Sequence, residues 1–269
     1  MKIATLGPKG TFSHQATLSY NPKSEIIFKK TIWDIFNSVE NEDAEVGIVP
    51  IENSIGGTVG LTLDGLIEFD LNIIAETIIP VSHNLVSLGS IKDITTIYAH
   101  PQTYAQCIKF IRRNFKNSEI TQTISNGESA EKLIRKKDKT KAAIVSKIAA
   151  EIYNIKILKK DIQDNKHNTT RFIIISKSKA KKTGNDKTSI VIYPQVDKPG
   201  LLHSLLGIFS EREINLNKIE SRPTKSKLGD YFFFIDHKGH VDDAKVKEAL
   251  EIVKKEFHLK ILGSYPKGY

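Results

Sequence analysis

The sequence predicts an α/β protein of two units: a two-lobed, three-layer α/β domain, then a smaller domain with the order βαββαβ. Three observations predict this organisation. Short β-branched runs alternate with helical periods of apolar residues over roughly the first 178 residues. The lysine-rich segment SKSKAKKTGNDK, from Ser176 to Lys187, then interrupts the pattern. After it, six segments follow in the order strand, helix, strand, strand, helix, strand.

The first domain is expected over residues 1–178, with one lobe formed by about 1–76 plus 165–178 and the other by about 77–164. Its extended segments are short runs rich in β-branched residues, expected at 2–7, 25–30, 46–51, 72–88, 96–101, 119–124, 142–146 and 171–176. Its helices are expected at 13–20, 31–41, 57–69, 102–115, 128–137 and 147–153. Thr31 and Asp34 form a capping box for the second helix. Ligands of such sheets bind where strands end and helices begin.

The linker is expected at residues 179–187 and the second domain at 188–269. Strands are expected at 188–195, 214–223, 231–239 and 258–266, and helices at 199–213 and 242–257. This order is the ferredoxin-like arrangement. An exposed face or edge of so small a sheet needs covering, so we expect a homodimer or a homotetramer.

Composition excludes several classes of protein. The net charge of +9 comes mostly from scattered lysines, without the aromatic interleaving of a nucleic-acid surface, so no nucleic acid is expected as a partner. Cys107 is the single cysteine, and the eight histidines lack metal-binding spacing, so neither a disulfide nor a metal is expected. No apolar run suits a secretory signal or a membrane span, which indicates a cytoplasmic protein.

Polar side chains follow several strands of the first domain. The segments are GPKGTFSHQA (7–16), PIENSIGGTV (50–59), HPQTYAQC (100–107), NGESAEKL (126–133) and HNTTRF (167–172). Each alone could be an ordinary helix cap or strand end, for example through Thr11 or Ser13. Together they describe a cleft for a small molecule with several carboxylates. No nucleophile–base set stands out, so the chemistry is expected to be leaving-group or electrostatic assistance.

The segment HNTTRF also predicts on which side of the strand each side chain lies. If residues 170–172 are in strand geometry, Thr170 and Phe172 share one face and Arg171 points to the other. Thr170 and Arg171 then cannot both reach the same ligand atom.

These segments, in this order and together with AAIVSKIAAEIYNIKIL, resemble the prephenate dehydratase family. DKPGLLHSLLGIFSEREINLNKIESRP and YFFFIDHKGH resemble an ACT regulatory domain. The resemblance implies a first domain like the type II periplasmic binding proteins and conversion of prephenate to phenylpyruvate without a cofactor. It implies Thr170 as the catalytic residue, as proton donor or as polarising donor. It also implies a set of substrate contacts: Thr11, Phe12, Ser13, Asn53, Ser54, Gly57, Thr58, Gln102, Ser129, Asn168 and Arg171.

The resemblance further implies feedback regulation by L-phenylalanine, bound between paired ACT domains. The implied effector residues are Gly200, Leu201, Leu202, Asn215, Leu216, Glu220, Ser221 and Arg222. Two positions depart from the family pattern: the segment around Ser129 has fewer threonines, and Leu201 stands where alanine is common. Arogenate as substrate, or a ligand-sensing protein without catalysis, stay open as alternatives. Because Met1 leads straight into the first strand, we expect a single activity without a chorismate mutase segment.

Overall fold

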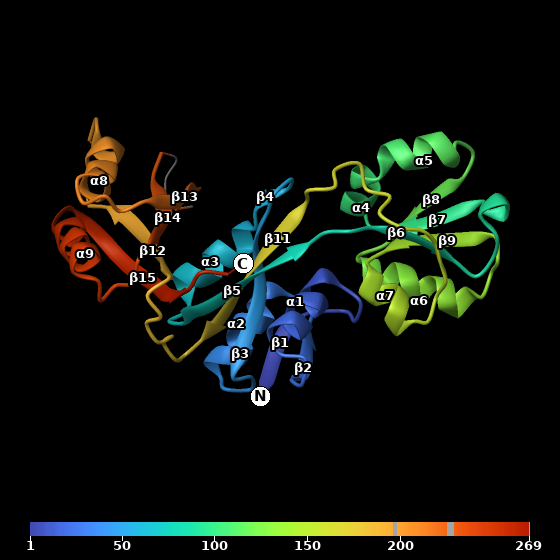
Figure 1. The fold of residues 1–269 in the computed structure, drawn as a ribbon, viewed down its shortest axis with the longest axis horizontal. Helices are drawn as coiled ribbons and strands as arrows, with labels where there is room; N and C mark the ends of the chain where they lie inside the picture. Colours follow the sequence, from blue (N-terminus) through green and yellow to red (C-terminus); the bar gives the residue numbers. More distant parts are fainter. Residues whose placement is uncertain (196–197, 225–228, 269) are drawn as a thin grey trace.

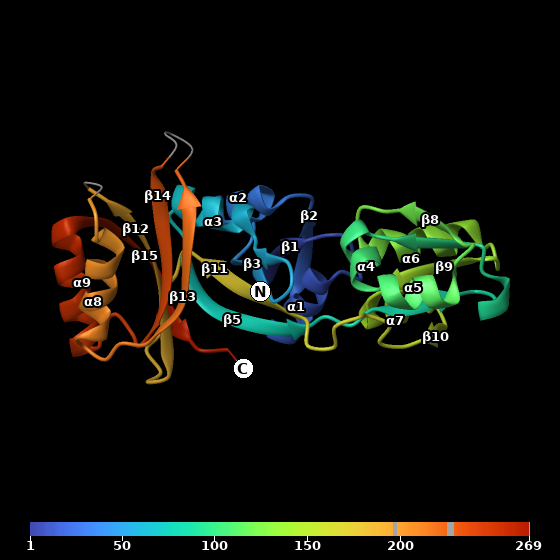
Figure 2. The same ribbon diagram turned by 90° about the horizontal axis from the view of Figure 1, so that it is seen from above.

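The computed structural model describes residues 1–195, 198–224 and 229–268. Asp197, the first residue of the first ACT-like segment, lies outside them. The fold class is confirmed: two α/β lobes are followed by a βαββαβ unit. Figures 1 and 2 show the first lobe in the middle of an elongated molecule, with the second lobe at one end and the C-terminal unit at the other. No helix among the described residues is long and apolar enough to cross a membrane.

The first sheet has the strand order β2-β1-β3-β11-β5, and the short strand β4 pairs with the end of β3. Its strands are β1 (Lys2–Leu6), β2 (Glu25–Lys29), β3 (Val46–Asn53), β4 (Gly57–Thr58), β5 (Asn72–Pro80) and β11 (Thr169–Ser176). β1, β2 and β3 are parallel, whereas β11 runs antiparallel to both β3 and β5. The chain therefore returns from the second lobe to place β11 between two strands of the first.

Helices cover both faces of this sheet. α1 (Phe12–Tyr20) packs on the face that carries Phe172 and Ile174, and α2 (Ile32–Glu40) and α3 (Gly60–Glu68) pack on the face of Ile173 and Ile175. The capping box of α2 is confirmed, with reciprocal bonds of 3.0 and 3.1 Å between Thr31 and Asp34.

The prediction that a helix begins near Gly57 was wrong. Gly57 has a φ of +75° and turns the chain back, so that Gly57 and Thr58 pair with Asn53 and Glu52 as a hairpin. α3 begins only at Gly60, two residues after the hairpin. The polar loop after β3 is therefore held against that strand.

The second sheet has the order β10-β6-β9-β7-β8. Its strands are β6 (Asn84–Ser87), β7 (Thr96–Ala99), β8 (Glu119–Gln122), β9 (Lys141–Val145) and β10 (Ile157–Lys159). The helices of this lobe are η1 (Ile91–Asp93), α4 (Pro101–Gln106), α5 (Ile108–Asn114), α6 (Asn126–Lys136) and α7 (Lys147–Ile152). The single helix expected at 102–115 is divided at the buried Cys107, and β10 was not predicted.

The C-terminal sheet has the order β13-β14-β12-β15. Its strands are β12 (Asp186–Pro194), β13 (Leu216–Pro223), β14 (Tyr231–Lys238) and β15 (Phe257–Pro266), and its helices are α8 (Leu201–Ser210) and α9 (Ala244–Glu256). Both helices pack on one face, against Ile190, Ile192 and Ile235.

The other face of the C-terminal sheet packs on the first lobe. Val191, Phe234 and Leu262 belong to one continuous apolar cluster with Ile73 and Ile173. The sheet face that was expected to need a second copy is thus covered, at least in part, by the same chain.

Candidate active site

A cavity of about 280 Å³ lies between the two lobes of the first domain. The first lobe contributes the ends of β1 and β3, the first residues of the antiparallel β11, the start of α1 and the residue before α3. These lining residues are Leu6, Thr11, Phe12, Ser13, Pro50, Asn53, Val59, Thr170 and Phe172. The second lobe and its entry strand contribute Val81, His83, His100, Gln102, Thr103, Gln106, Ile124, Ser125 and Asn126. The cavity thus lies where strands end and helices begin, as expected for this class of sheet.

Thr170 is held in this cavity by Asn53 on the neighbouring strand. The Asn53 side-chain oxygen accepts hydrogen bonds from the backbone N–H groups of Ile55 (3.1 Å) and Gly56 (2.8 Å). Its amide nitrogen must therefore face the other way, and it donates to Thr170 Oγ1 at 2.9 Å. Since that oxygen accepts, the hydroxyl hydrogen of Thr170 remains to be donated. Among the described residues it meets no acceptor, so it is available to a bound molecule.

The orientation of the Asn53 amide also determines which way the next side chains in the hydrogen-bonded series point, as far as His83 between the lobes. Asn53 also donates to Asn168 Oδ1 (2.8 Å), and Asn168 then donates to Gln106 Oε1 (3.2 Å). His83 Nε2 lies 2.8 Å from the same Gln106 oxygen and must donate to it. The backbone anchor at Asn53 thereby fixes the His83 tautomer. Burial, the largest influence, lowers the pKa of His83 and favours its uncharged ring.

The loop after β1 lines the cavity through the start of α1. The Thr11 side chain accepts from the backbone N–H of His14 at 3.2 Å and caps the helix. The ring of Phe12 meets the edge of His83 at a centroid distance of 5.7 Å. Capping and lining are therefore compatible roles, since Thr11, Phe12 and Ser13 all border the cavity.

The two lobes meet closely beside the cavity. Gly127 of α6 lies so near the loop after β1 that a β-carbon there would stand 2.2 Å from the carbonyl oxygen of Lys9. Asn126 accepts from the Thr103 hydroxyl at 2.8 Å, which joins α6 to α4. Only glycine fits at this close contact between the lobes.

No charged side chain of Lys, Arg, Asp or Glu lines the cavity in the described part of the chain. Its polar groups are hydroxyls, amides and imidazoles. Cys107 is buried in the apolar core of the second lobe, and burial raises the pKa of its thiol to about 12, so it is not a thiolate nucleophile. The described residues also contain no group of three or more side chains that could hold a metal ion.

Comparison with known proteins identifies the family. Residues 3–180 match the family model of prephenate dehydratase, and residues 189–254 match that of the ACT domain. The chain belongs to the prephenate dehydratase family. The prephenate dehydratase of Methanocaldococcus jannaschii is 40% identical over 96% of each chain. The bifunctional chorismate mutase/prephenate dehydratase of Aquifex aeolicus is 41% identical over all of this chain and 74% of its own length. The crystal structure of an Arthrobacter aurescens prephenate dehydratase in complex with L-Phe superposes with a TM-score of 0.90, at 34% identity, over 99% of this chain and 90% of that one.

Within the prephenate dehydratase fold, two more expected residues border this site without lining the cavity. The Ser54 hydroxyl donates to Asn168 Oδ1 at 3.2 Å and accepts from the backbone N–H of Thr169 at 3.0 Å. Asn168 is 2% exposed. Together they support the Asn53–Thr170 pair from the loop side.

Four expected substrate contacts are placed elsewhere and need correction. Ser129 is fully buried and bonds to Thr123 at 2.7 Å inside the second lobe. Gly57 and Thr58 lie on the hairpin, and the Thr58 hydroxyl faces the ACT domain, 2.8 Å from Glu220. Arg171 extends from the face of β11 opposite Thr170, because neighbouring strand residues alternate.

Sequence reasoning missed several lining residues of the second lobe. His83 stands in the extended crossing between the lobes, where no helix start or glycine marks it. Ser125 and Asn126 open α6 and could have been found from their place before a helix, yet Ser129 was chosen instead. Gln106 ends α4, and its contacts to His83 and Asn168 join segments distant in the sequence.

The expected effector residues divide into groups within the ACT domain. Gly200 precedes α8 and Asn215 follows it, so a ten-residue helix, roughly 15 Å long, separates them. Leu201 is 7% exposed and packs in the domain core, and it also borders a second cavity of about 240 Å³ with Tyr193 and Phe233. The residues before and after α8 therefore form no single pocket within the described part of one chain.

Glu220 and Arg222 are engaged with the first lobe. Glu220 accepts from the Thr58 hydroxyl, and Arg222 makes two bonds of 2.6 Å to Asp64 of α3. These two side chains therefore join the ACT domain to the lobe that carries Thr170. Their place at an effector site between paired chains stays a prediction.

Proposed function

We propose that this chain catalyses the decarboxylative dehydration of prephenate to phenylpyruvate, with Thr170 as the catalytic residue. The single observation that carries the proposal is the Thr170 hydroxyl, whose oxygen accepts from Asn53 and whose hydrogen is left to donate into the cavity between the lobes. Family membership supports the same assignment.

The reaction breaks two bonds of prephenate. The electrons of the bond to the ring carboxylate pass into the ring as carbon dioxide leaves, and the bond to the 4-hydroxyl breaks as the ring becomes aromatic. The departing hydroxyl leaves as water once it is protonated. Thr170 donates a hydrogen bond to that oxygen and stabilises the negative charge that develops on it.

Thr170 acts here as a polarising donor rather than as one member of a proton relay. Its hydroxyl oxygen is bound by the Asn53 amide, and a neutral amide cannot supply a proton at ordinary pH. The proton of the product water then comes from solvent or from the substrate.

The uncharged cavity wall suits the loss of carbon dioxide. An arginine or lysine against the ring carboxylate would stabilise the ground state and slow its departure. Neutral donors such as Gln102, Ser125 and Asn126 can hold the other carboxylate without that cost.

Phenylalanine is the proposed effector, bound between ACT domains of paired chains in a homodimer or a homotetramer. The Arthrobacter relative was solved with L-Phe, and Gly200 with Leu201 and Leu202 lies at the start of α8.

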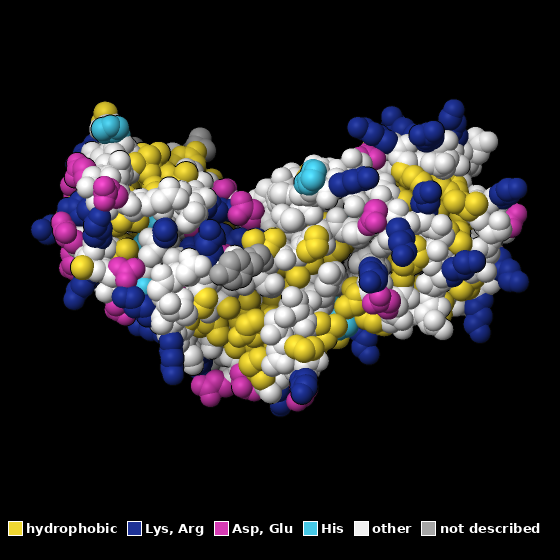
Figure 3. Space-filling model, in the orientation of Figure 1, with side chains coloured by type: hydrophobic (Ala, Val, Ile, Leu, Met, Phe, Trp, Pro, Cys, Tyr) yellow, Lys and Arg dark blue, Asp and Glu magenta, His cyan; other side chains and the backbone are white. Residues whose placement is uncertain are grey.

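We also propose that the chain divides into a catalytic domain at residues 1–178, a linker at 179–187 and an ACT domain at 188–269. We propose further that the protein acts in the cytoplasm and binds no nucleic acid. In Figure 3, lysine and arginine side chains are scattered over the second lobe and form no single patch.

The test is turnover of prephenate by the purified protein, followed as phenylpyruvate, with arogenate and with added L-phenylalanine in parallel. Turnover of prephenate that phenylalanine suppresses is the expected result. Faster turnover of arogenate would overturn the substrate assignment. No turnover of either, with tight binding of prephenate, would support a ligand-sensing protein instead.

A further inference from the structure

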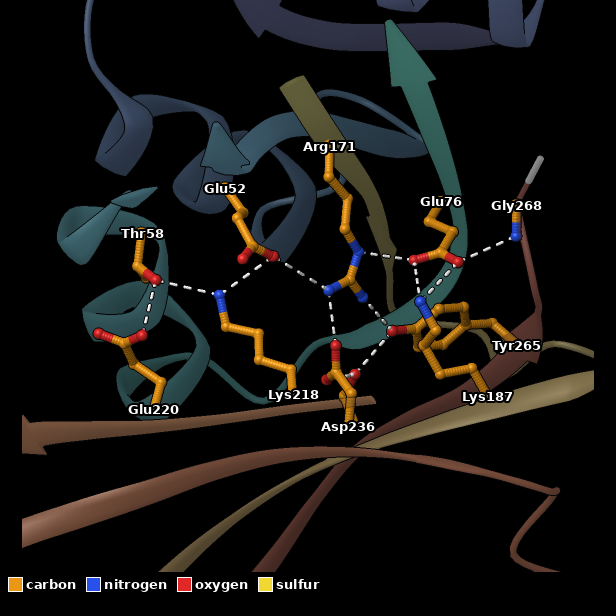
Figure 4. Close-up of polar contacts among 11 residues, drawn as sticks. Glu52, Thr58, Glu76, Arg171, Lys187, Lys218, Glu220, Asp236, Tyr265 and Gly268 are labelled. Carbon is orange, nitrogen blue, oxygen red and sulfur yellow. Dashed lines mark hydrogen bonds and ion pairs between the residues drawn. The ribbon is translucent and has the colours of Figure 1, made fainter. Parts of the chain in front are cut away.

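A cluster of buried charges lies directly behind Thr170, on the face of β11 that the cavity does not use (Figure 4). Arg171 donates from Nε to Glu76 of β5 at 2.6 Å, from Nη1 to Asp236 of β14 at 2.5 Å, and from Nη2 to the Tyr265 hydroxyl of β15 at 2.9 Å. Its side chain is 10% exposed, and those of Glu76 and Asp236 are 1% and 8% exposed. Two of the three partners belong to the ACT domain.

The ACT-domain partners are themselves fixed. The Ser189 hydroxyl lies 2.5 Å from the second oxygen of Asp236 and 2.6 Å from the Tyr265 hydroxyl. Burial opposes the charge of Arg171, yet its neighbours Tyr265, Asp236 and Glu76 raise its pKa above the ordinary value. Arg171 therefore remains a cation locked between the first lobe and the ACT domain.

A second contact reaches the strand next to Thr170. Lys218 of β13 lies 3.2 Å from Glu52 and donates to the Thr58 hydroxyl at 3.0 Å. Glu52 precedes Asn53, the residue that holds Thr170. The ACT domain thus contacts the residue adjacent to each member of the Asn53–Thr170 pair.

The register of β3 and β11 explains why these contacts bear on the catalytic pair. Thr170 is opposite Asn53, and Arg171 is opposite Glu52, while a bulge follows between Arg171 and Phe172. The extra residue is Ile51 of β3, whereas the pairing of β11 with β5 is unbroken from Thr169 to Ile174. The contacts of Glu52 and Arg171 with the ACT domain therefore add support beside the bulge, on the face opposite the catalytic pair.

We propose that Arg171 is a positioning residue, held by Asp236 and Tyr265 of the ACT domain so that Thr170 keeps its catalytic orientation. This inference rests on the proposed function. The ACT domain completes the active-site geometry even before any effector binds. A movement of that domain relative to the first lobe changes the rate through Arg171, with no residue of the ACT domain touching the substrate.

The test is a double-mutant cycle between Asp236→Asn and Thr170→Ala, measured as kcat and KM for prephenate. Asp236→Asn keeps the shape but removes one of the two carboxylates bonded to Arg171, the one that the ACT domain supplies, and we expect kcat to fall about tenfold to a hundredfold, with KM little changed. In the Thr170→Ala background the same substitution should have little further effect, because the group it positions is gone. Asp242→Asn, at an aspartate whose side chain is 75% exposed, serves as the matched control.

The outcomes separate this inference from the proposed function. Wild-type protein that does not turn over prephenate contradicts the proposed function. Equal factors of Asp236→Asn in both backgrounds, or no effect in either, overturn the positioning role and leave the proposed function intact. If Asp236→Asn does not fold, Tyr265→Phe replaces it in the cycle, since it removes only the hydroxyl bonded to Nη2 of Arg171 and to Ser189.

Discussion

The two faces of the β3–β11 ladder differ in the polar groups they carry. On the cavity face, Asn53 and Thr170 belong to a set of uncharged amides and hydroxyls. On the opposite face, Glu52 and Arg171, the adjacent residues of the same strands, belong to a buried set of ions. Strand alternation alone produces this separation.

The difference indicates how one short segment can serve two purposes. An uncharged cavity wall allows the ring carboxylate to leave as carbon dioxide. On the opposite face, the buried charges can hold the strand because each cation is bonded to a carboxylate. Substitutions on the cavity face should therefore act on rate alone, and those on the ionic face should act on stability and, through Arg171, on rate. The following predictions test that division.

The largest effect is expected on the cavity face. Thr170→Ala removes the donor to the departing hydroxyl and should lower kcat roughly 10²- to 10³-fold, with the free energy of unfolding little changed. Thr170→Ser keeps the hydroxyl and is the matched control. A rate for Thr170→Ala close to that of wild type would refute the catalytic role of Thr170.

The next effect is expected on the ionic face. Arg171→Gln leaves Asp236 and Glu76 buried without the guanidinium and should lower the free energy of unfolding by roughly 3 kcal/mol, measured by urea denaturation. Lys245→Gln, which breaks an exposed pair with Glu213, should cost less than about 0.5 kcal/mol. Equal losses in the two variants would mean that the cluster contributes no more than a surface ion pair.

The ionic face also shows which features can be predicted from neighbouring residues in the sequence. Period-two alternation predicted that Thr170 and Arg171 point apart, and the structure agrees. The family resemblance grouped both with the substrate, because a sequence motif records which residues stand together and not which way they face. The βαββαβ order of the C-terminal unit and the capping box at Thr31 also depend on near neighbours, and both are confirmed.

The missed parts depend on contacts between distant segments. His83 joins the site through Gln106, and Gly127 is needed because the Lys9 loop lies against it. The hairpin at Gly57 and Thr58 was read as a helix start, since a glycine pair fits either interpretation. The contacts of Glu220 and Arg222 with the first lobe were not predicted, because they join segments that are distant in the sequence.

A smaller effect should distinguish the donor from its support. Asn53→Asp keeps the acceptor for the backbone N–H groups of Ile55 and Gly56 but replaces the amide donor by an acceptor. The Thr170 hydroxyl then divides its donation between the introduced carboxylate and the substrate. We expect kcat to fall about tenfold, measured with prephenate, since one well-placed hydrogen bond is redirected. Ser38→Ala, at a helix hydroxyl outside the cavity, should leave kcat unchanged.

The smallest effect is expected from pH, through two buried histidines. Burial, as the largest cause, lowers the pKa of both His83 and His237 from the ordinary value of 6.5. As the pH falls through about 6.5, the unfolded chain takes up protons that the folded chain refuses. The free energy of unfolding should therefore decrease as the pH falls below that value, until each folded pKa is reached.

The slope of that decrease reports the number of protons involved, with a limit of roughly 1.4 kcal/mol per pH unit for each. Thermal or urea unfolding measures this slope between about pH 8 and about pH 5, the range over which histidine titrates. His237→Gln should flatten the dependence. The part of the slope that remains in His237→Gln belongs to His83 together with His14 and His100, because burial lowers the pKa of these three histidines as well. A variant curve identical to that of wild type would show that His237 is not excluded from charging by the fold.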